Sequence, residues 1–414
     1  MRICILTDYY YPQLGGITEH VHGQAVNLAA RGHEVTILTG RIPHAPRATD
    51  RDQRVLNADG VELVHMGLAT PLYGNGSQTL HTLLPFGMRR LRRFFAARQF
   101  DVVHTHAPYN PSSFMLAPFA LPDGAIGVGT YHSVFTPGRL RDLVHAPTRA
   151  SLSRLHGHVV VSAACIAPLD HYFPEFAWRV IPNGIDEDHF SPAARPLDEL
   201  RASGDPVVLF LGRFDPRNGL GIMLDSFDRV WHAREGHVRL CVVGDGPLRG
   251  HYLRRLPEDL QSSVQFAGRV DWNRPRYYAS ADVLCSPCLK ASFGMVLLEA
   301  MSCALPIVAS RISGFELLVE QGREGQLVAP PDEPAAFAAG IERMLDAPAE
   351  RKRMGAEGRH TAVTRYAWHR VADQLATFYA ELRGDHHPGD GRPVPQGMAV
   401  TTTTSPVRST CVPS

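Results

Sequence analysis

The segment of residues 282–310 constrains the fold more strongly than any other part of the chain. Residues 282–286 and 306–309 are short apolar runs of the kind that forms buried parallel strands. Between them, residues 295–303 contain no Gly or Pro and continue as an apolar helix. The order strand, loop, helix, strand indicates a parallel sheet with helices packed on its faces.

The loop before this helix, residues 290–294, is a candidate anion site. Backbone N–H groups at a helix N-terminus lack intrahelical partners and lie at the positive end of the helix dipole, so they favour a phosphate. Glu299 lies about one turn inside the helix, where a carboxylate needs hydrogen-bond donors. A nucleotide sugar supplies both a phosphate and hydroxyl groups. The expected donor site consists of Ser292, Phe293, Gly294, Met295, Val296 and Glu299.

The rest of the chain repeats this alternation in two groups of strands. The expected strands are residues 2–7, 34–38, 61–65, 101–106, 126–131, 159–162 and 179–181, then 207–211, 238–243, 264–266, 282–286, 306–309 and 325–328. Helical patterns separate most of them, which predicts an α/β fold with two Rossmann-like domains and doubly wound parallel sheets. Ligands of such sheets bind beyond the carboxyl ends of the strands, where Tyr9, His106 and His132 are expected.

The composition narrows the classes of protein. With 44% hydrophobic and 20% charged residues, 414 residues can bury the cores of two domains. A net charge of +1 argues against a general nucleic-acid binder. The chain enters a strand at once and has no apolar run of about 18 residues, so we expect neither a signal peptide nor a membrane span. The seven scattered cysteines fit a reducing cytoplasm.

The sequence SFGMVLLEAM at residues 292–301 resembles the signature of family 4 glycosyltransferases. These are retaining enzymes of the GT-B fold, in which two Rossmann-like domains face each other across a cleft. The resemblance implies that Glu299 binds the ribose of a nucleotide and that no metal is needed. The chain departs from the family at Ala291, where a first Glu is expected, and at Ala304, where Gly is usual.

The resemblance extends over almost the whole chain and predicts its organisation. The expected parts are residues 1–184 as the first domain, 185–206 as a linker, 207–366 as the nucleotide-sugar domain, 367–383 as a helix that crosses back, and 384–414 as a disordered tail.

Other residues are expected to contact the diphosphate. The Gly15-Gly16 turn permits close backbone approach to a phosphate, although an ordinary tight turn explains it equally well. Arg213 follows a strand and can bind a diphosphate with its fork of N–H groups. The family has a Lys where this chain has Asn218, and we predict that Lys290 supplies the missing charge.

The sequence at Gly268, Arg269 and Val270 resembles the family's loop whose backbone contacts the nucleobase. This match predicts that these three residues contact the nucleobase of the donor.

Histidines at the predicted strand ends are the candidates for contact with the transferred sugar. His132 is expected near that sugar and, with Arg213 and Lys290, completes the predicted catalytic set; a hydrogen-bonded core histidine is the ordinary alternative. His104 and His106 alternate on one strand, as a metal pair would, but no third ligand with suitable spacing stands out. We therefore expect no metal, and interpret His106 as lining the acceptor side of the cleft and His104 as structural.

A basic amphipathic segment precedes the strand at residues 101–106. Its apolar residues follow helical spacing on both sides of Pro85: Leu80, Leu83, Leu84, Met88, Leu91, Phe94 and Phe95. The arginines beside them are Arg89, Arg90, Arg92 and Arg93. The pattern favours an anionic membrane surface, and a helix packed on the sheet with solvated arginines is the alternative. A similar segment occurs in the phosphatidylinositol α-mannosyltransferases. Tyr9 and Asn75 also resemble residues on the acceptor side of those enzymes.

These features predict a retaining glycosyltransferase that moves a hexose, with mannose favoured, to a lipid or lipid-linked acceptor. The donor is a nucleotide diphosphate sugar, with GDP-mannose favoured, and no cofactor is expected beyond this co-substrate. We expect a cytoplasmic protein, peripheral on the inner face of the cytoplasmic membrane. Ala291 and Asn218 leave open a catalytically inactive nucleotide-sugar-binding protein. A sugar-nucleotide epimerase of the same fold is a second alternative, although the acid and base carboxylates that it needs are not evident.

Overall fold

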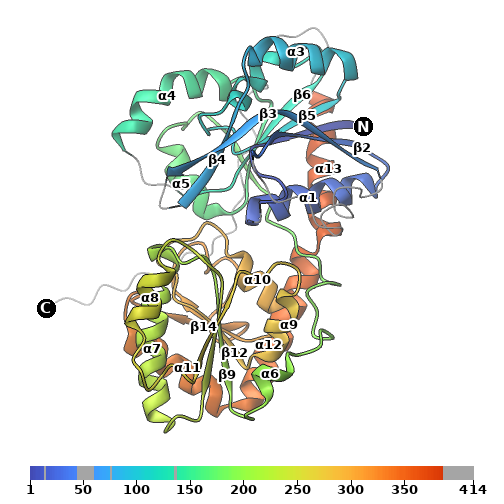
Figure 1. Ribbon diagram of the computed structural model, residues 1–414. Helices are drawn as coiled ribbons and strands as arrows, with labels where there is room; N and C mark the ends of the chain where they lie inside the picture. The colour runs from blue at the N-terminus through green and yellow to red at the C-terminus, as the bar shows by residue number, and fades with distance from the viewer. Residues whose placement is uncertain (14, 44–59, 75–76, 135–137, 386–414) are drawn as a thin grey trace, which may run out of the picture.

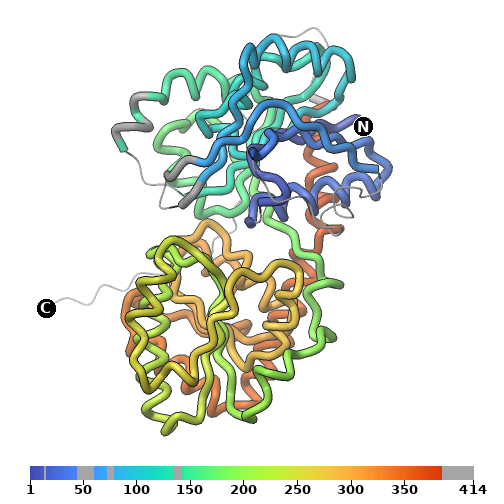
Figure 2. The backbone as a smooth tube through the Cα atoms, viewed as in Figure 1, coloured from blue at the N-terminus to red at the C-terminus, as the bar shows by residue number. Residues whose placement is uncertain are grey.

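A computed structural model of the chain describes residues 1–13, 15–43, 60–74, 77–134 and 138–385. They form two α/β domains, one above the other in Figure 1. The tube in Figure 2 follows the chain from the first domain, in blue and green, into the second, in yellow and orange, and back again. The predicted fold class is confirmed.

The first domain is built on an eight-stranded sheet with the order β4-β3-β2-β1-β5-β6-β7-β8. Its strands are β1 (Arg2–Thr7), β2 (Glu34–Arg41), β3 (Val61–Gly74), β4 (Ser77–Leu83), β5 (Val102–His106), β6 (Ile126–Tyr131), β7 (Gly157–Val160) and β8 (Trp178–Val180). Among the strands that the structure describes in this domain, only β3 and β4 pair antiparallel. Its helices are α1 (Gly16–Ala29), α3 (Gly87–Arg98), η1 (Ser113–Ala120), α4 (Arg139–Leu152), η2 (Ala163–Cys165) and α5 (Ile166–Asp170). The strand order reverses between β1 and β5, so a ligand crevice is expected above their carboxyl ends.

The second domain has a six-stranded parallel sheet with the order β11-β10-β9-β12-β13-β14. Its strands are β9 (Val207–Leu211), β10 (Arg239–Val243), β11 (Val264–Gly268), β12 (Val283–Ser286), β13 (Ile307–Ser310) and β14 (Gly325–Val328). Its helices are α6 (Asp198–Arg201), η3 (Pro216–Asn218), α7 (Leu220–Ala233), α8 (Arg249–Arg255), α9 (Arg274–Ser280), α10 (Met295–Ser302), α11 (Pro334–Asp346), α12 (Pro348–Thr361) and η4 (Ala362–Tyr366). Here the order reverses between β9 and β12, which again marks the carboxyl ends of these strands.

The last described helix, α13 (Trp368–Asp385), returns to the first domain and lies beside α1 (Figure 1). Val371, Leu375 and Tyr379 on α13 are fully buried in one apolar cluster with Ile3 and Ile5 of β1. The helix includes two residues that the sequence assigned to the tail, and residues 386–414 lie outside the described part of the chain.

The prediction that the apolar residues from Leu80 to Phe95 form one helical stripe was wrong for the first half of this segment. Residues 77–83 form β4, which pairs antiparallel with β3, for example Leu68 opposite Leu83. Leu80, Leu83 and Leu84 have helical spacing, but the neighbouring strand supplies backbone partners that propensity alone does not reveal. The helix begins only after Pro85, at Gly87.

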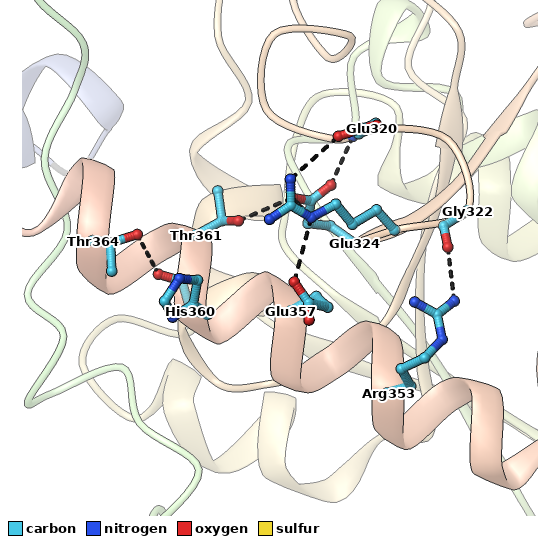
Figure 3. Close-up of polar contacts among 9 residues, drawn as sticks. Glu320, Gly322, Glu324, Arg353, Glu357, His360, Thr361 and Thr364 are labelled. Atoms are coloured by element: carbon cyan, nitrogen blue, oxygen red, sulfur yellow. Dashed lines mark hydrogen bonds and ion pairs between the residues drawn. The ribbon is translucent and has the colours of Figure 1, made fainter.

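A polar network holds α12 against the loop that precedes β14 (Figure 3). Arg323 contacts Glu320, Glu324 and Glu357 at 3.3–3.6 Å. The hydroxyl of Thr361 also donates to Glu324, at 2.9 Å. Because α12 packs against α10, this network supports the helix that carries the predicted donor motif.

Candidate functional site

The residues predicted to bind the donor and the transferred sugar lie near the carboxyl ends of strands in both sheets. Gly15 and Gly16 follow β1, while His106 and His132 lie at the ends of β5 and β6. In the second domain, loops after β9, β11 and β12 carry Arg213, Arg269 and Ser292. Both switch points therefore contribute to one site between the domains.

Gly294 gives the loop before α10 its shape. It adopts φ 104°, and a Cβ at this position would lie 2.8 Å from the ring of Phe315, so only glycine fits without displacement. No side chain caps the N-terminus of α10 at Gly294. Phe293 is buried in the core directly before it. The loop thus brings an uncapped helix N-terminus to the site, as an anion requires.

This loop touches the first domain at the predicted sugar-binding histidine. Ser292 Oγ donates a hydrogen bond to the backbone carbonyl of His132 at 2.7 Å. Ser162 Oγ in turn donates to the carbonyl of Ser292. A Cβ on Gly16 would lie 3.5 Å from Cγ of Met295, so the Gly15-Gly16 turn faces the first residue of α10. The structure therefore brings together motifs that lie far apart in the sequence.

Glu299 is buried, with 2% of its surface exposed, and both of its oxygens have partners. Tyr278 donates its hydroxyl to Oε2 at 2.7 Å, and an Arg274 nitrogen lies 3.4 Å from Oε1. Burial raises the pKa of Glu299 to about 7, although the positive charge of Arg274 opposes this shift. Neither partner was predicted from the sequence. Their one signal was that Arg274 and Tyr278 are four residues apart, a spacing that places two side chains on the same face of a helix.

Arg213 is held by a residue that the sequence did not single out. Its Nε lies 3.3 Å from Oδ2 of Asp215, which is fully buried. Asn218, at the family's Lys position, donates its amide to the carbonyl of Arg213 at 2.8 Å. Asn218 therefore stabilises the backbone of the arginine, where the family's Lys would add a charge.

Lys290 and the predicted base-binding residues lie on two different loops of the second domain, after β12 and β11. Lys290 is half-buried, and its carbonyl accepts the thiol of Cys288 at 3.3 Å. Arg269 is exposed and lies 3.6 Å from Asp271, while Gly268 ends β11 and Val270 is half-buried. Their roles toward a nucleotide stay predictions.

A buried cluster of three histidines lies on the first-domain side of the site. His20, His106 and His132 place nitrogen atoms within 4.8 Å of one another. Nδ1 of His106 and Nε2 of His132 are 2.8 Å apart. Burial lowers the pKa of His20 to about 4 and the pKa values of His106 and His132 well below the usual range, so all three are neutral at pH 7.

The predicted absence of a metal stays a prediction. Among the described residues, His106 lies with His20 of α1 and with His132, which directly follows β6, whereas His104 takes no part in this group. Nδ1 of His20 and Nε2 of His106 have no hydrogen-bond partner among the described residues, so the cluster has the donor atoms for a cation such as Zn²⁺. In its present arrangement, the bond between His106 and His132 occupies one nitrogen of each ring.

His104 has the structural role that the sequence indicated. It is fully buried, its Nε2 lies 2.6 Å from the hydroxyl of Thr130, and its Nδ1 bonds to Gln24 and Tyr379. It thus joins β6, α1 and α13.

Two residues remain on the predicted acceptor side. Tyr9 is partly buried, and its hydroxyl accepts the amide of Asn110 at 3.1 Å. Burial raises the pKa of Tyr9 above its ordinary value, so it stays protonated. Asn75 lies outside the described residues.

The basic helix α3 presents its arginines to solvent. Arg89, Arg90, Arg92 and Arg93 are exposed, whereas Leu91 and Phe95 are buried against the sheet. Phe86 precedes the helix with 85% of its surface exposed, and Leu83 at the end of β4 is 56% exposed. Four cations and two large apolar side chains thus lie within one short stretch. None of the helices in the described part of the chain has the length and apolar character needed to cross a membrane.

Comparison with known proteins identifies the family of the chain. Residues 14–189 match the family described as Glycosyltransferase Family 4, and residues 205–347 match the one described as Glycosyl transferases group 1. The phosphatidyl-myo-inositol mannosyltransferase of Mycobacterium tuberculosis is 34% identical over 390 residues, covering 93% of this chain and 98% of that protein. The D-inositol 3-phosphate glycosyltransferase of Thermobifida fusca is 30% identical over 402 residues, covering 89% and 88%.

Solved structures share the architecture. Sucrose-phosphate synthase from Thermosynechococcus elongatus superposes with a TM-score of 0.73 at 23% identity, covering 93% of this chain and 99% of that one. The Anabaena protein HepE, in complex with UDP and glucose, gives a TM-score of 0.71 at 19% identity, covering 92% and 99%. The chain belongs to glycosyltransferase family 4 and has the GT-B fold.

Proposed function

We propose that this chain is a retaining mannosyltransferase that uses GDP-mannose and acts on a lipid of the phosphatidylinositol class. The observation that carries the proposal is the hydrogen bond from Ser292 to the carbonyl of His132, because it joins the anion-binding loop to the histidine expected near the sugar. Relatives named phosphatidyl-myo-inositol mannosyltransferase support the choice of mannose and of a lipid acceptor.

The donor is bound between the two domains. The N-terminus of α10 and the facing Gly15-Gly16 turn bind the diphosphate, and Arg213, held by Asp215, neutralises part of its charge. Glu299 accepts hydroxyl groups of the ribose. Neutral His132 hydrogen-bonds the transferred sugar, because burial keeps its pKa low.

Transfer takes place on one face of the sugar. The bond between the anomeric carbon and the diphosphate oxygen breaks while the acceptor oxygen forms its bond to that carbon on the same side. The acceptor proton passes to an oxygen of the leaving diphosphate. Backbone N–H groups of the Ser292–Val296 loop and the cations Arg213 and Lys290 stabilise the charge that develops there.

The acceptor is approached at the inner face of the cytoplasmic membrane. The exposed arginines of α3 bind anionic headgroups, and the neighbouring Phe86 and Leu83 enter the interface. This surface lies on the first domain, which also carries Tyr9 and the histidine cluster.

The test is transfer by the purified protein from GDP-mannose to phosphatidylinositol in mixed vesicles, with and without EDTA. We expect a mannolipid with the anomeric configuration of the donor, formed at an unchanged rate in EDTA. An inverted product, or loss of activity in EDTA, would contradict the retaining, metal-independent mechanism.

Two controls separate the alternatives. Binding of GDP-mannose without transfer, and without slow hydrolysis when the acceptor is omitted, would indicate an inactive nucleotide-sugar-binding protein. Interconversion of the sugar nucleotide would indicate an epimerase.

A further inference from the structure

Arg274 joins the two domains at the proposed ribose site. It is the first residue of α9, and one of its terminal nitrogens lies 2.6 Å from Glu19 of α1 and 3.4 Å from Glu299 of α10. Figure 1 shows α1 at the edge of the first domain that faces the second. A single guanidinium therefore bridges a carboxylate of the first domain and the proposed ribose-binding carboxylate.

The surroundings of this bridge make it more than a surface ion pair. The side chains of Arg274, Glu19 and Glu299 are 15%, 21% and 3% exposed, so solvent screens them poorly. The guanidinium also lies over the ring of Phe190, 5.5 Å from its centroid. Burial lowers the pKa of Arg274, but the negative charges of Glu299 and Glu19 outweigh this effect and raise the pKa above its ordinary value.

Arg274 and Glu19 act on the pKa of Glu299 in opposite directions. Burial raises the pKa of Glu299 most; Arg274 then lowers it, and Glu19 raises it. Among the described residues, Glu299 also interacts with two other titratable groups: Tyr278, which donates a hydrogen bond to it, and Cys303, which directly follows α10. Since the resulting pKa is about 7, small changes in this group of charges alter how much of Glu299 is ionised at neutral pH.

We propose that Arg274 is a positioning residue that couples closure of the two domains to nucleotide binding by bridging Glu19 and Glu299. This inference rests on the proposed function, in which Glu299 accepts the ribose hydroxyls. When the domains close, Glu19 holds the guanidinium in place beside Glu299. The guanidinium then keeps Glu299 ionised and fixes its orientation together with Tyr278.

The test measures the affinity for GDP-mannose by calorimetry between pH 6 and pH 8.5, without acceptor. Arg274→Met should move the midpoint of the pH dependence upward, because Glu299 loses its cation. Glu19→Gln removes a negative charge near Glu299 but also the contact that holds Arg274 beside it, so the positioning role predicts an upward shift, whereas loss of the repulsion alone predicts a downward shift. We expect each shift to exceed about 0.5 pH units, which is roughly a threefold change in the ionisation equilibrium.

A second readout does not depend on the nucleotide. Small-angle scattering of the ligand-free protein should give a larger radius of gyration for both variants, and Arg274→Lys should restore part of the closed form. Arg276→Met is the matched control, because Arg276 lies on the same helix but donates to the carbonyls of Arg195 and Pro196. Circular dichroism verifies that each variant is folded.

The outcomes separate this inference from the proposed function. If the parent protein binds no GDP-mannose, the proposed function fails, whatever the scattering shows. If the parent binds but Arg274→Met keeps its pH midpoint, or Glu19→Gln keeps it or shifts it downward, the positioning role is refuted. An unchanged radius of gyration in both variants refutes the coupling to closure.

Discussion

Replacing Glu299 with Gln isolates the charge of the proposed ribose-binding group. Gln keeps the size of the side chain, and its carbonyl oxygen can still accept the Tyr278 hydroxyl, which lies 2.7 Å from Oε2 in the parent. Arg274 keeps its closer partner, Glu19, at 2.6 Å. The substitution therefore mainly weakens hydrogen bonds from a ligand to a carboxylate.

The expected loss follows from the strength of such bonds. A hydrogen bond to a charged group contributes about 1.5–3 kcal/mol, so the affinity for GDP-mannose should fall roughly 10- to 150-fold at pH 8. Because the pKa of Glu299 is about 7, the parent should lose affinity as the pH falls from 8 to 6 and the carboxylate takes up a proton. The Gln variant has no such proton and should lack this pH dependence.

The assay is calorimetric titration with GDP-mannose, whose diphosphate diester does not titrate in this range. Glu258→Gln, an exposed carboxylate of the same domain, is the control and should behave as the parent. If the Glu299→Gln variant binds within about twofold of the parent at pH 8, or keeps the parent's pH dependence, Glu299 does not bind the ribose.

Four further predictions follow from the same structure. Lys290→Ala should lower kcat/KM by roughly 30- to 1,000-fold, the effect of losing about 2–4 kcal/mol of transition-state stabilisation, and Asn218→Lys should restore part of it; a change within about twofold rules out the compensation. Replacing all four α3 arginines with Ser should weaken co-sedimentation with anionic vesicles at low salt, by about 1 kcal/mol for each arginine; equal binding would show that the helix serves only the fold. Ala304→Gly should raise the free energy of unfolding by about 1 kcal/mol in urea denaturation, because Ala304 has φ 57°; an unchanged midpoint would contradict this strain. His20 has its pKa lowered by burial to about 4, so its contribution to stability is fully present above about pH 6.5 and is lost as the pH falls toward 4; denaturation of His20→Asn should show a shallower acid loss than the parent.

The strands and the donor motif could be predicted from the sequence because their signals are local. The apolar runs before Arg213 and Ser292 are bounded by turn residues, and Gly294 directly precedes the apolar helix. Ala304 is a second local case: it follows a helix C-terminus, where glycine adopts φ above zero more easily than alanine. Short-range pattern and chain geometry determine these features.

The parts that the sequence did not predict depend on contacts between distant segments. Leu80 and Leu83 have helical spacing, yet pairing with β3 decides that they form a strand. His20 gave no signal as a partner of His106, because it lies on a different element and meets that residue only in the folded domain. Arg274 gave no signal in the sequence, and its importance depends on Glu19, 255 positions earlier.

The missing first Glu of the family motif restricts how the chemistry can proceed. Ala291 offers no carboxylate in the loop proposed to bind the diphosphate, and three buried or half-buried carboxylates of the described residues have other partners. Glu299 and Glu19 share Arg274, and Asp8 accepts the backbone N–H of Thr82 at 2.9 Å. None of them lies ready as a nucleophile for a covalent intermediate. A mechanism in which the leaving diphosphate itself takes the acceptor proton uses no carboxylate, which is why the substitution at position 291 is compatible with the retaining transfer proposed for this chain.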